Sequence, residues 1–250
     1  MNYILFPFRF LYKVYFAFYF ATSLVLFYPI FKIFLYKKAR FPYAFKIMRF
    51  YSKLWLFFTG VRLSVKGKEN ILSSQPYLIC SNHSSFLDIP CIYSIFDNYF
   101  VFTGKKEIEK WPLFNIFYTS GMNILVDRDN KIGALKGFKE MIKVIEEGHP
   151  IVVFPEGTIS KTAPELTEFK NGAVKLAIQK QIPILPITFL TNWERLQRKG
   201  FFSGKAGPGV SEVIIHPAIL TTGLTKNETE LLQIKLQDII SAPLKSRFGV

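Results

Sequence analysis

The sequence contains little cysteine, little charge and, in its first 68 residues, no acidic residue. Two cysteines, Cys80 and Cys91, are too few for a disulfide scaffold, so the chain does not require an oxidising compartment. Charged residues make up only 20% of the 250 positions and hydrophobic residues make up 50%, which excludes a disordered, solvated chain. This length suits one ordinary domain with an appendage.

The absence of acid makes the first 68 residues strongly basic. Twelve Lys and Arg residues precede Glu69, the first acidic residue, and supply +12 of the formal net charge of +14. The same segment, up to Phe58, holds 23 of the 42 aromatic residues. Nucleic-acid-binding arms are basic but polar, because they stay solvated when unbound. A basic segment this rich in aromatic residues favours an anionic membrane as partner, and we expect no nucleic acid.

Residues 14–31 form an uncharged run of 18 residues, and basic residues flank both ends of it. Such a run is at the lower limit for crossing a bilayer, which takes roughly 17–25 residues. A cleaved signal peptide is the alternative, but its apolar core is usually only ~7–15 residues and ends at a small-residue cleavage site. We therefore expect the segment to be retained. More basic residues follow the run than precede it, which predicts that the rest of the chain lies on the cytoplasmic side.

Residues 41–59 have the spacing of a second, amphipathic helix. Lys46, Arg49 and Lys53 fall on one face, and the opposite face carries Ala44, Met48, Tyr51, Trp55 and Phe58. Such a helix can lie in an anionic membrane interface or pack its aromatic face on the rest of the protein. We expect residues 1–59 to form a two-helix membrane anchor. The sequence leaves open whether the first helix crosses the bilayer or enters one leaflet.

From residue 60 the pattern changes to short apolar runs that alternate with helical spacing. Strands are expected at 61–65, 77–80, 99–102, 123–126, 151–154, 184–190 and 212–215, and helices at roughly 88–96, 105–119, 131–147, 170–180 and 226–241. This alternation predicts an α/β domain over residues 60–250, with a mostly parallel central sheet flanked by helices. In such sheets, functional residues gather at the carboxyl ends of the strands.

The first polar motif, SNHSSFLD over residues 81–88, follows an expected strand. Of the three histidines only His83 has both a nearby carboxylate and a strand end before it. A loop that enters a helix can fold Asp88 back onto the imidazole, which fixes the tautomer and leaves the other nitrogen as a base. A structural histidine is the alternative. No G-x-S-x-G motif offers a serine nucleophile, so the pair fits a transferase that uses its substrate's hydroxyl. No paired C-x-x-C motif is present, and a metal is not expected.

The second polar motif, FPEGTIS over residues 154–160, also follows an expected strand. Its proline and Gly157 predict a turn that presents Glu156, and Thr158 and the loop amides can bind a polar substrate. A carboxylate repels a bare phosphate, so Glu156 suits a substrate hydroxyl or a neighbouring basic residue.

Two cations follow other expected strands and are candidates for binding phosphate. Arg128 follows the strand at 123–126, and Lys105 follows the strand at 99–102. Phosphate binding requires such cations or a group of backbone N–H donors. For Arg128 the alternative is an ion pair with a neighbouring aspartate.

Four motifs in this order, NHSSFLD, GMNILVDR, FPEGTIS and IPILPITF, resemble the sequence blocks of the 1-acylglycerol-3-phosphate acyltransferases. The resemblance covers about residues 60–215, and the pairing of H-x4-D with a later FPEGT makes it specific. It implies transfer of a fatty acyl group from acyl-CoA or acyl carrier protein to the sn-2 hydroxyl of 1-acyl-glycerol-3-phosphate. The product would be phosphatidic acid, made in phospholipid biosynthesis without a metal or organic cofactor. It also implies a membrane enzyme, which we expect at the bacterial inner membrane.

The resemblance implies a role for each matching residue. His83 would be the general base and Asp88 its orienting partner. The glycerol phosphate would be bound by Glu156, Gly157 and Thr158, with Arg128 on the phosphate. Lys105 stays a candidate cation.

One position departs from the family pattern. The family commonly has Arg directly after FPEGT, and this chain has Ile159. Lys161 could substitute, but lysine is not a fork-shaped donor. The departure leaves room for another lysolipid acceptor, such as one with an amino-acid head group. A further alternative is a non-catalytic membrane-binding protein that keeps the polar site for structural reasons.

Overall fold

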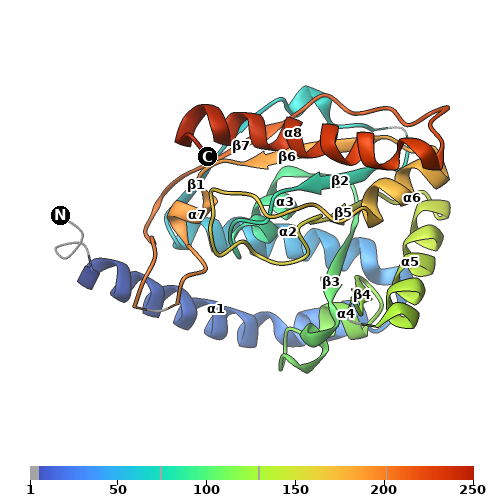
Figure 1. Cartoon of the computed structure of the whole chain (residues 1–250). Helices are drawn as coiled ribbons and strands as arrows, with labels where there is room; N and C mark the ends of the chain where they lie inside the picture. Colours follow the sequence, from blue (N-terminus) through green and yellow to red (C-terminus); the bar gives the residue numbers. More distant parts are fainter. Residues whose placement is uncertain (1–5, 74, 129, 201) are drawn as a thin grey trace.

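A seven-stranded sheet forms the centre of the computed structural model (Figure 1), which describes residues 6–73, 75–128, 130–200 and 202–250. The strand order is β1-β7-β6-β2-β5-β3-β4. Every neighbouring pair is parallel except β6 and β7. The strands are β1 Val61–Lys66, β2 Leu78–Ser81, β3 Val101–Lys105, β4 Ile124–Val126, β5 Ile151–Val153, β6 Ile184–Phe189 and β7 Gly209–Ile215. The predicted α/β fold with a mostly parallel sheet is confirmed.

Helices cover both faces of the sheet. On one face lie α5 (Lys131–Glu146), α6 (Gly172–Lys180) and α8 (Thr229–Phe248); on the other lie α2 (Phe41–Phe58) and α3 (Asp88–Ile95). Because both faces are covered, the central strands are apolar on both sides. In β2, for example, Leu78 joins the core under α5, α6 and α8, whereas Ile79 joins the core under α2 and α3.

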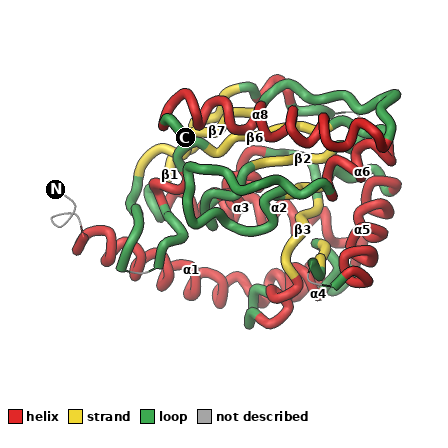
Figure 2. Tube along the Cα trace, viewed as in Figure 1, coloured by secondary structure: helices red, strands yellow, loops and turns green. Residues whose placement is uncertain are grey.

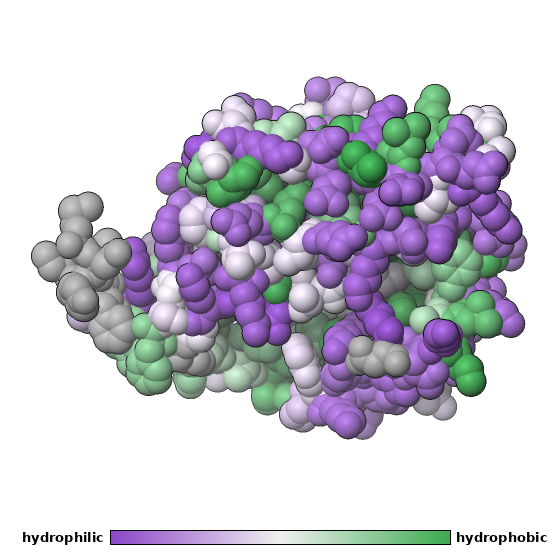
Figure 3. Space-filling view, in the orientation of Figure 1, coloured by the Kyte–Doolittle hydropathy of each residue, from purple (hydrophilic) through white to green (hydrophobic). Residues whose placement is uncertain are grey.

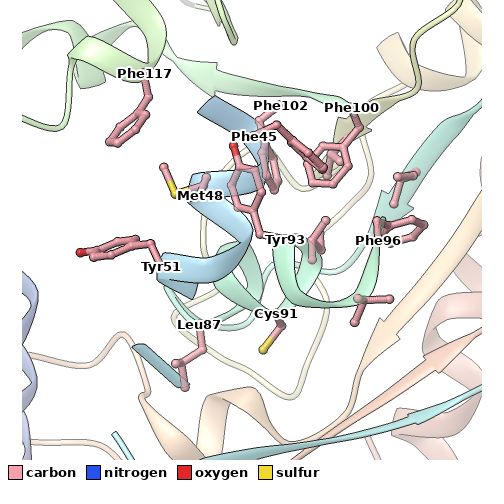
Figure 4. Packing of buried hydrophobic residues seen from close by; sticks show 14 of the residues in the cluster. Phe45, Met48, Tyr51, Leu87, Cys91, Tyr93, Phe96, Phe100, Phe102 and Phe117 are labelled. Atoms are coloured by element: carbon pink, nitrogen blue, oxygen red, sulfur yellow. The ribbon is translucent and has the colours of Figure 1, made fainter. Parts of the chain in front are cut away.

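The core between the sheet and α2 is aromatic (Figure 4). Phe45 of α2 packs on Phe100 and Tyr93, with ring centroids 4.9 and 5.6 Å apart, and Tyr93 of α3 packs on Phe102 at 5.2 Å. Aromatic pairs contribute about 0.5–1.5 kcal/mol each beyond their buried area. These contacts fix α3 against the sheet, and Asp88 is the first residue of α3.

The N-terminal residues form two helices joined by a 3-10 turn at Lys38–Arg40. The first, α1 (Phe6–Leu35), continues through Pro29 and is longer than the predicted run of 14–31. Within the described residues one helix, over Pro7–Leu35, is long and apolar enough to cross a membrane. The predicted aromatic face of α2 packs inside the protein at Ala44, Met48, Tyr51 and Trp55, whereas Phe58 is exposed.

The outward side of α1 is apolar. Large apolar side chains on it are between 62% and 74% exposed, namely Phe8, Leu11, Phe18 and Leu26. Figure 3 shows apolar residues along the lower left edge of the molecule, where Figure 1 places α1. The inward side of α1 packs on α2: the rings of Phe16 and Trp55 lie 4.4 Å apart, and the Ser23 and Tyr51 hydroxyls are 2.9 Å apart.

The prediction of one helix over residues 105–119 is wrong. The segment has a 3-10 turn at Lys106–Lys110 and a short helix α4 (Ile116–Thr119). Between them Pro112 lacks a backbone N–H and Leu113 has a φ of +64°, and both features interrupt a helix. A further short helix, α7 (Asn192–Arg195), was not predicted.

Candidate active site

The two polar motifs meet at one edge of the sheet. β2 and β5 are parallel neighbours with Cys80 paired to Val153. Each motif begins where its strand ends, and the second continues into a long loop over 154–171 that contains no helix or strand (Figure 2). Because parallel strands end at the same edge, the histidine loop and the FPEGT turn are brought together, as the sequence predicts.

Asp88 folds back onto His83. Nδ1 of His83 lies 2.9 Å from Oδ2 of Asp88. The Asp88 carboxylate is fully buried and receives the backbone N–H groups of Ser84 and Ser85 at 2.7 and 2.9 Å. Its other oxygen receives Nδ2 of Asn192 at 2.7 Å. These donors and the N-terminal end of α3 suit a carboxylate, which accepts hydrogen bonds only.

The His83 imidazole is held so that one nitrogen faces outward. Its ring stacks on Phe154 with a centroid distance of 3.9 Å and an interplanar angle of 13°. The side chain is 11% exposed. Among the described residues no group hydrogen-bonds Nε2 of this ring. With the Nδ1–H donated to Asp88, Nε2 carries a lone pair and can accept a proton.

Glu156 is turned inward. It is 5% exposed, and Oε1 accepts the backbone N–H of His83 at 2.7 Å. Oε2 accepts both the N–H and the hydroxyl of Thr167 at 2.9 Å. Burial raises the pKa of Glu156, and the hydrogen bonds from His83 and Thr167 oppose that rise. The FPEGT glutamate therefore joins the histidine loop to the 154–171 loop. The predicted contact of Glu156 with a substrate stays a prediction.

Gly157 and Arg128 are in contact beside Glu156. Gly157 has a φ of +79°, which favours glycine, and its N–H closes a turn onto the Phe154 carbonyl at 2.9 Å. The Gly157 carbonyl accepts a hydrogen bond from Nη1 of Arg128. A Cβ at position 157 would lie 2.7 Å from that nitrogen, so a side chain there would displace Arg128. The structure thus places Arg128 beside the FPEGT turn.

The remaining predicted residues are Thr158, which lies in the FPEGT turn, and Lys105, which lies on β3. The exposed Thr158 accepts a hydrogen bond from Nη1 of Arg198 at 2.7 Å. Lys105 is the last residue of β3, which pairs with β5, and it forms an ion pair with Glu107 at 2.5 Å. The described residues contain no group of three or more His, Cys, Asp or Glu that could hold a metal ion.

Sequence reasoning missed three residues of the site: Thr167, Asn192 and Arg198. Asn192 follows β6, the other neighbour of β2, so the strand-end rule that found His83 also points to it. Thr167 and Arg198 lie in loops, 11 and 40 residues along the chain from the groups that they contact, and no local pattern marks them.

The fold and site define an α/β protein with a His–Asp pair, whose carboxylate is fully buried, at the carboxyl edge of a mostly parallel sheet. A family model described as Acyltransferase matches residues 62–190, which is more than half of the chain. The chain belongs to this acyltransferase family.

Several similar proteins carry the name 1-acyl-sn-glycerol-3-phosphate acyltransferase. The 1-acyl-sn-glycerol-3-phosphate acyltransferase of Borreliella burgdorferi is 30% identical over 204 residues, which cover 81% of this chain and 80% of that protein. The protein of the same name from Limnanthes douglasii is 33% identical over 156 residues, 62% of this chain and 53% of that protein. The chain spans about half the length of the plant relatives it matches.

A solved structure has the same fold over nearly the whole chain. The 1-acyl-sn-glycerophosphate acyltransferase of Thermotoga maritima superposes with a TM-score of 0.78 and covers 98% of this chain and 97% of its own. Its sequence is 21% identical. The shared fold includes the N-terminal helical part as well as the sheet.

Proposed function

We propose that this protein transfers a fatty acyl group from an acyl thioester to the sn-2 hydroxyl of 1-acyl-glycerol-3-phosphate, giving phosphatidic acid. The observation that carries the proposal is the 2.9 Å contact between His83 Nδ1 and Asp88 Oδ2, with the other ring nitrogen directed away from the carboxylate. The names of the relatives that match this chain support the choice of substrate.

The geometry suits direct transfer. Nε2 of His83 accepts the proton of the acceptor hydroxyl as its oxygen attacks the thioester carbonyl. The C–S bond then breaks, and the departing thiolate takes the proton from the imidazolium. Asp88 orients the ring and stabilises its charged form during the step. No protein nucleophile is used, so no acyl-enzyme forms.

The residues around the FPEGT turn then divide into two groups. Glu156 holds the backbone of His83 and so positions the base. Arg128, Thr158 and the turn at Gly157 bind the acceptor phosphate, with Lys105 as a further cation. Arg128 suits this role because a guanidinium presents several donors to a tetrahedral anion.

The N-terminal helices support residence at a membrane. We propose that residues 1–59 form the membrane-associated part and residues 60–250 the catalytic domain. The exposed apolar side of α1 would lie in lipid, and the basic side of α2 would face anionic head groups. The donor is acyl-CoA or acyl carrier protein on the cytoplasmic side of a bacterial inner membrane, and no cofactor takes part.

Acyl transfer by detergent-purified protein tests the proposal. Wild type, His83→Ala and His149→Ala are assayed with acyl-CoA and acyl carrier protein as donors. The acceptors are lysophosphatidic acid and a lysolipid without a phosphomonoester. His149 packs on Tyr99 away from the site and serves as the matched control.

We expect wild type and His149→Ala to form phosphatidic acid, and His83→Ala to be slower by about 10²–10⁴-fold, the usual loss of a general base. Activity on the second acceptor alone would replace the proposed substrate by another lysolipid. Absence of His83-dependent transfer with every pair would leave a non-catalytic membrane-binding protein.

A further inference from the structure

Two arginines from different loops donate hydrogen bonds to the FPEGT turn and to the residue that follows it. Arg128 follows β4 and donates to the Gly157 carbonyl. Arg198 follows α7, and its Nη1 donates to the Thr158 hydroxyl at 2.7 Å and to the Ile159 carbonyl at 2.9 Å. The two guanidinium groups therefore bind adjacent residues of one turn, and this turn holds the proposed base through Glu156 and Ser160.

Several N–H donors of the Arg198 guanidinium have no acceptor within the described residues. Only Nη1 of its guanidinium makes a hydrogen bond within the part of the chain that the structure describes, so Nη2 and Nε have no protein acceptor there. In the same part of the chain no carboxylate pairs with Arg198, whereas its neighbour Arg195 pairs with Glu194 at 3.3 Å. A guanidinium at the edge of a site that has no paired carboxylate and has N–H donors without an acceptor suits an anionic ligand.

The surroundings of Arg198 fix its position. In the loop that follows α7, the Leu196 carbonyl accepts the Ser85 hydroxyl at 2.8 Å, which ties the loop to the His83 motif. Further along, the Gly200 carbonyl accepts Nζ of the buried Lys13 at 2.8 Å. The guanidinium is thus pre-organised on the Thr158 side of the turn, and less entropy is lost when it binds a ligand.

Ile159 explains why a second arginine is needed. Its side chain is buried, so position 159 offers only its backbone carbonyl, and Arg198 binds that carbonyl. Lys161, the nearest lysine in sequence, is exposed and makes no hydrogen bond or ion pair among the described residues. We propose that Arg198, together with Arg128, binds the phosphomonoester of the acceptor and so makes the enzyme select a phosphorylated lysolipid. This inference rests on the proposed function.

Steady-state kinetics of Arg198→Ala, Arg198→Lys and Lys161→Ala test the inference. We expect Arg198→Ala to raise the KM for lysophosphatidic acid by about 10–100-fold, as the loss of charged hydrogen bonds predicts, and to leave the KM for the acyl donor unchanged. With 1-acylglycerol, which has no phosphate, the KM of Arg198→Ala should change far less than the KM for lysophosphatidic acid. Arg198→Lys should recover only part of the affinity. Lys161→Ala, the matched control, should behave as wild type.

Three outcomes overturn the inference and leave the proposed function standing. The first is an unchanged KM for lysophosphatidic acid in Arg198→Ala. The second is an equal loss of kcat on both acceptors in Arg198→Ala, which marks a purely structural role. The third is a raised KM for lysophosphatidic acid in Lys161→Ala but not in Arg198→Ala. If wild type itself fails to acylate lysophosphatidic acid, the proposed function fails first.

Discussion

The Glu156 carboxylate binds the backbone of His83: the His83 N–H donates to Oε1 of Glu156 at 2.7 Å. The Ser160 N–H, from the same turn, donates to the His83 carbonyl at 2.8 Å. The FPEGT motif thus holds the backbone of the proposed base, while Asp88 of the histidine motif holds its ring. The two motifs, about seventy residues apart in the chain, act as one unit that sets where Nε2 points.

Replacing Glu156 tests its role as a positioning residue. Glu156→Ala leaves the His83 and Thr167 N–H groups without an acceptor, and we expect kcat to fall by about 10²-fold, as a small misplacement of the base predicts. Glu156→Gln keeps an oxygen for His83 and should retain more activity than Glu156→Ala. Steady-state kinetics measures both variants, with the exposed Glu165→Gln as control. Full kcat in Glu156→Ala would contradict the role.

The buried Glu156 carboxyl also predicts a pH dependence of stability. Burial raises its pKa in the folded state, so the folded protein holds this proton more tightly than the unfolded chain does. The stabilisation is therefore complete at pH values below the ordinary glutamate pKa and is lost as the pH rises through the raised pKa. We expect the Tm of wild type to fall relative to that of Glu156→Gln over this pH window and the difference to become constant above it.

Thermal unfolding of both proteins in buffers from pH 4 to pH 8 provides this measurement. The comparison with Glu156→Gln cancels the groups that titrate in both proteins. A difference in Tm that is flat with pH, or that changes in the opposite direction, would show that burial does not govern this carboxyl.

How far the site could be predicted from the sequence depends on whether each contact is local. His83 and Asp88 are five residues apart, and the seven strands are short apolar runs, so both were predictable from spacing. Pro112 and Leu113 stop a helix that periodicity alone predicted. The inward orientation of Glu156 depends on Thr167, and the Asp88 contact with Asn192 spans 104 residues, so both arise only when the chain folds.

Asn192 is expected to support Asp88 without contacting substrate. Asn192→Ala removes the donor to Oδ1 of Asp88, and we expect kcat to fall about 10-fold, the cost of one hydrogen bond to a charged group, with both KM values unchanged. Asn115→Ala, which removes a half-buried amide that donates to the Glu109 carbonyl, is the control. A rise in either KM with kcat unchanged would place Asn192 in substrate binding instead.

The exposed side of α1 is expected to bind lipid. Replacing Phe18 and Leu26 with lysine places two charges on that side, each costing roughly 2.5–3.5 kcal/mol in the apolar part of a bilayer. We expect the double variant to sediment poorly with vesicles that contain anionic phospholipid. Ile132→Lys with Leu135→Lys, on an exposed part of α5, is the matched control. Equal sedimentation of the two double variants would contradict the assignment of α1.

In the proposed mechanism the His83–Asp88 pair activates the hydroxyl of the acceptor, and the protein supplies no nucleophile of its own. Mixing enzyme with acyl-CoA in the absence of acceptor, while recording free thiol and the mass of the intact protein, tests this claim most directly. We expect no burst of thiol and an unmodified mass, followed by rapid thiol release when lysophosphatidic acid is added. A burst equal to the enzyme concentration, with the mass of one acyl group added to the protein, would contradict it.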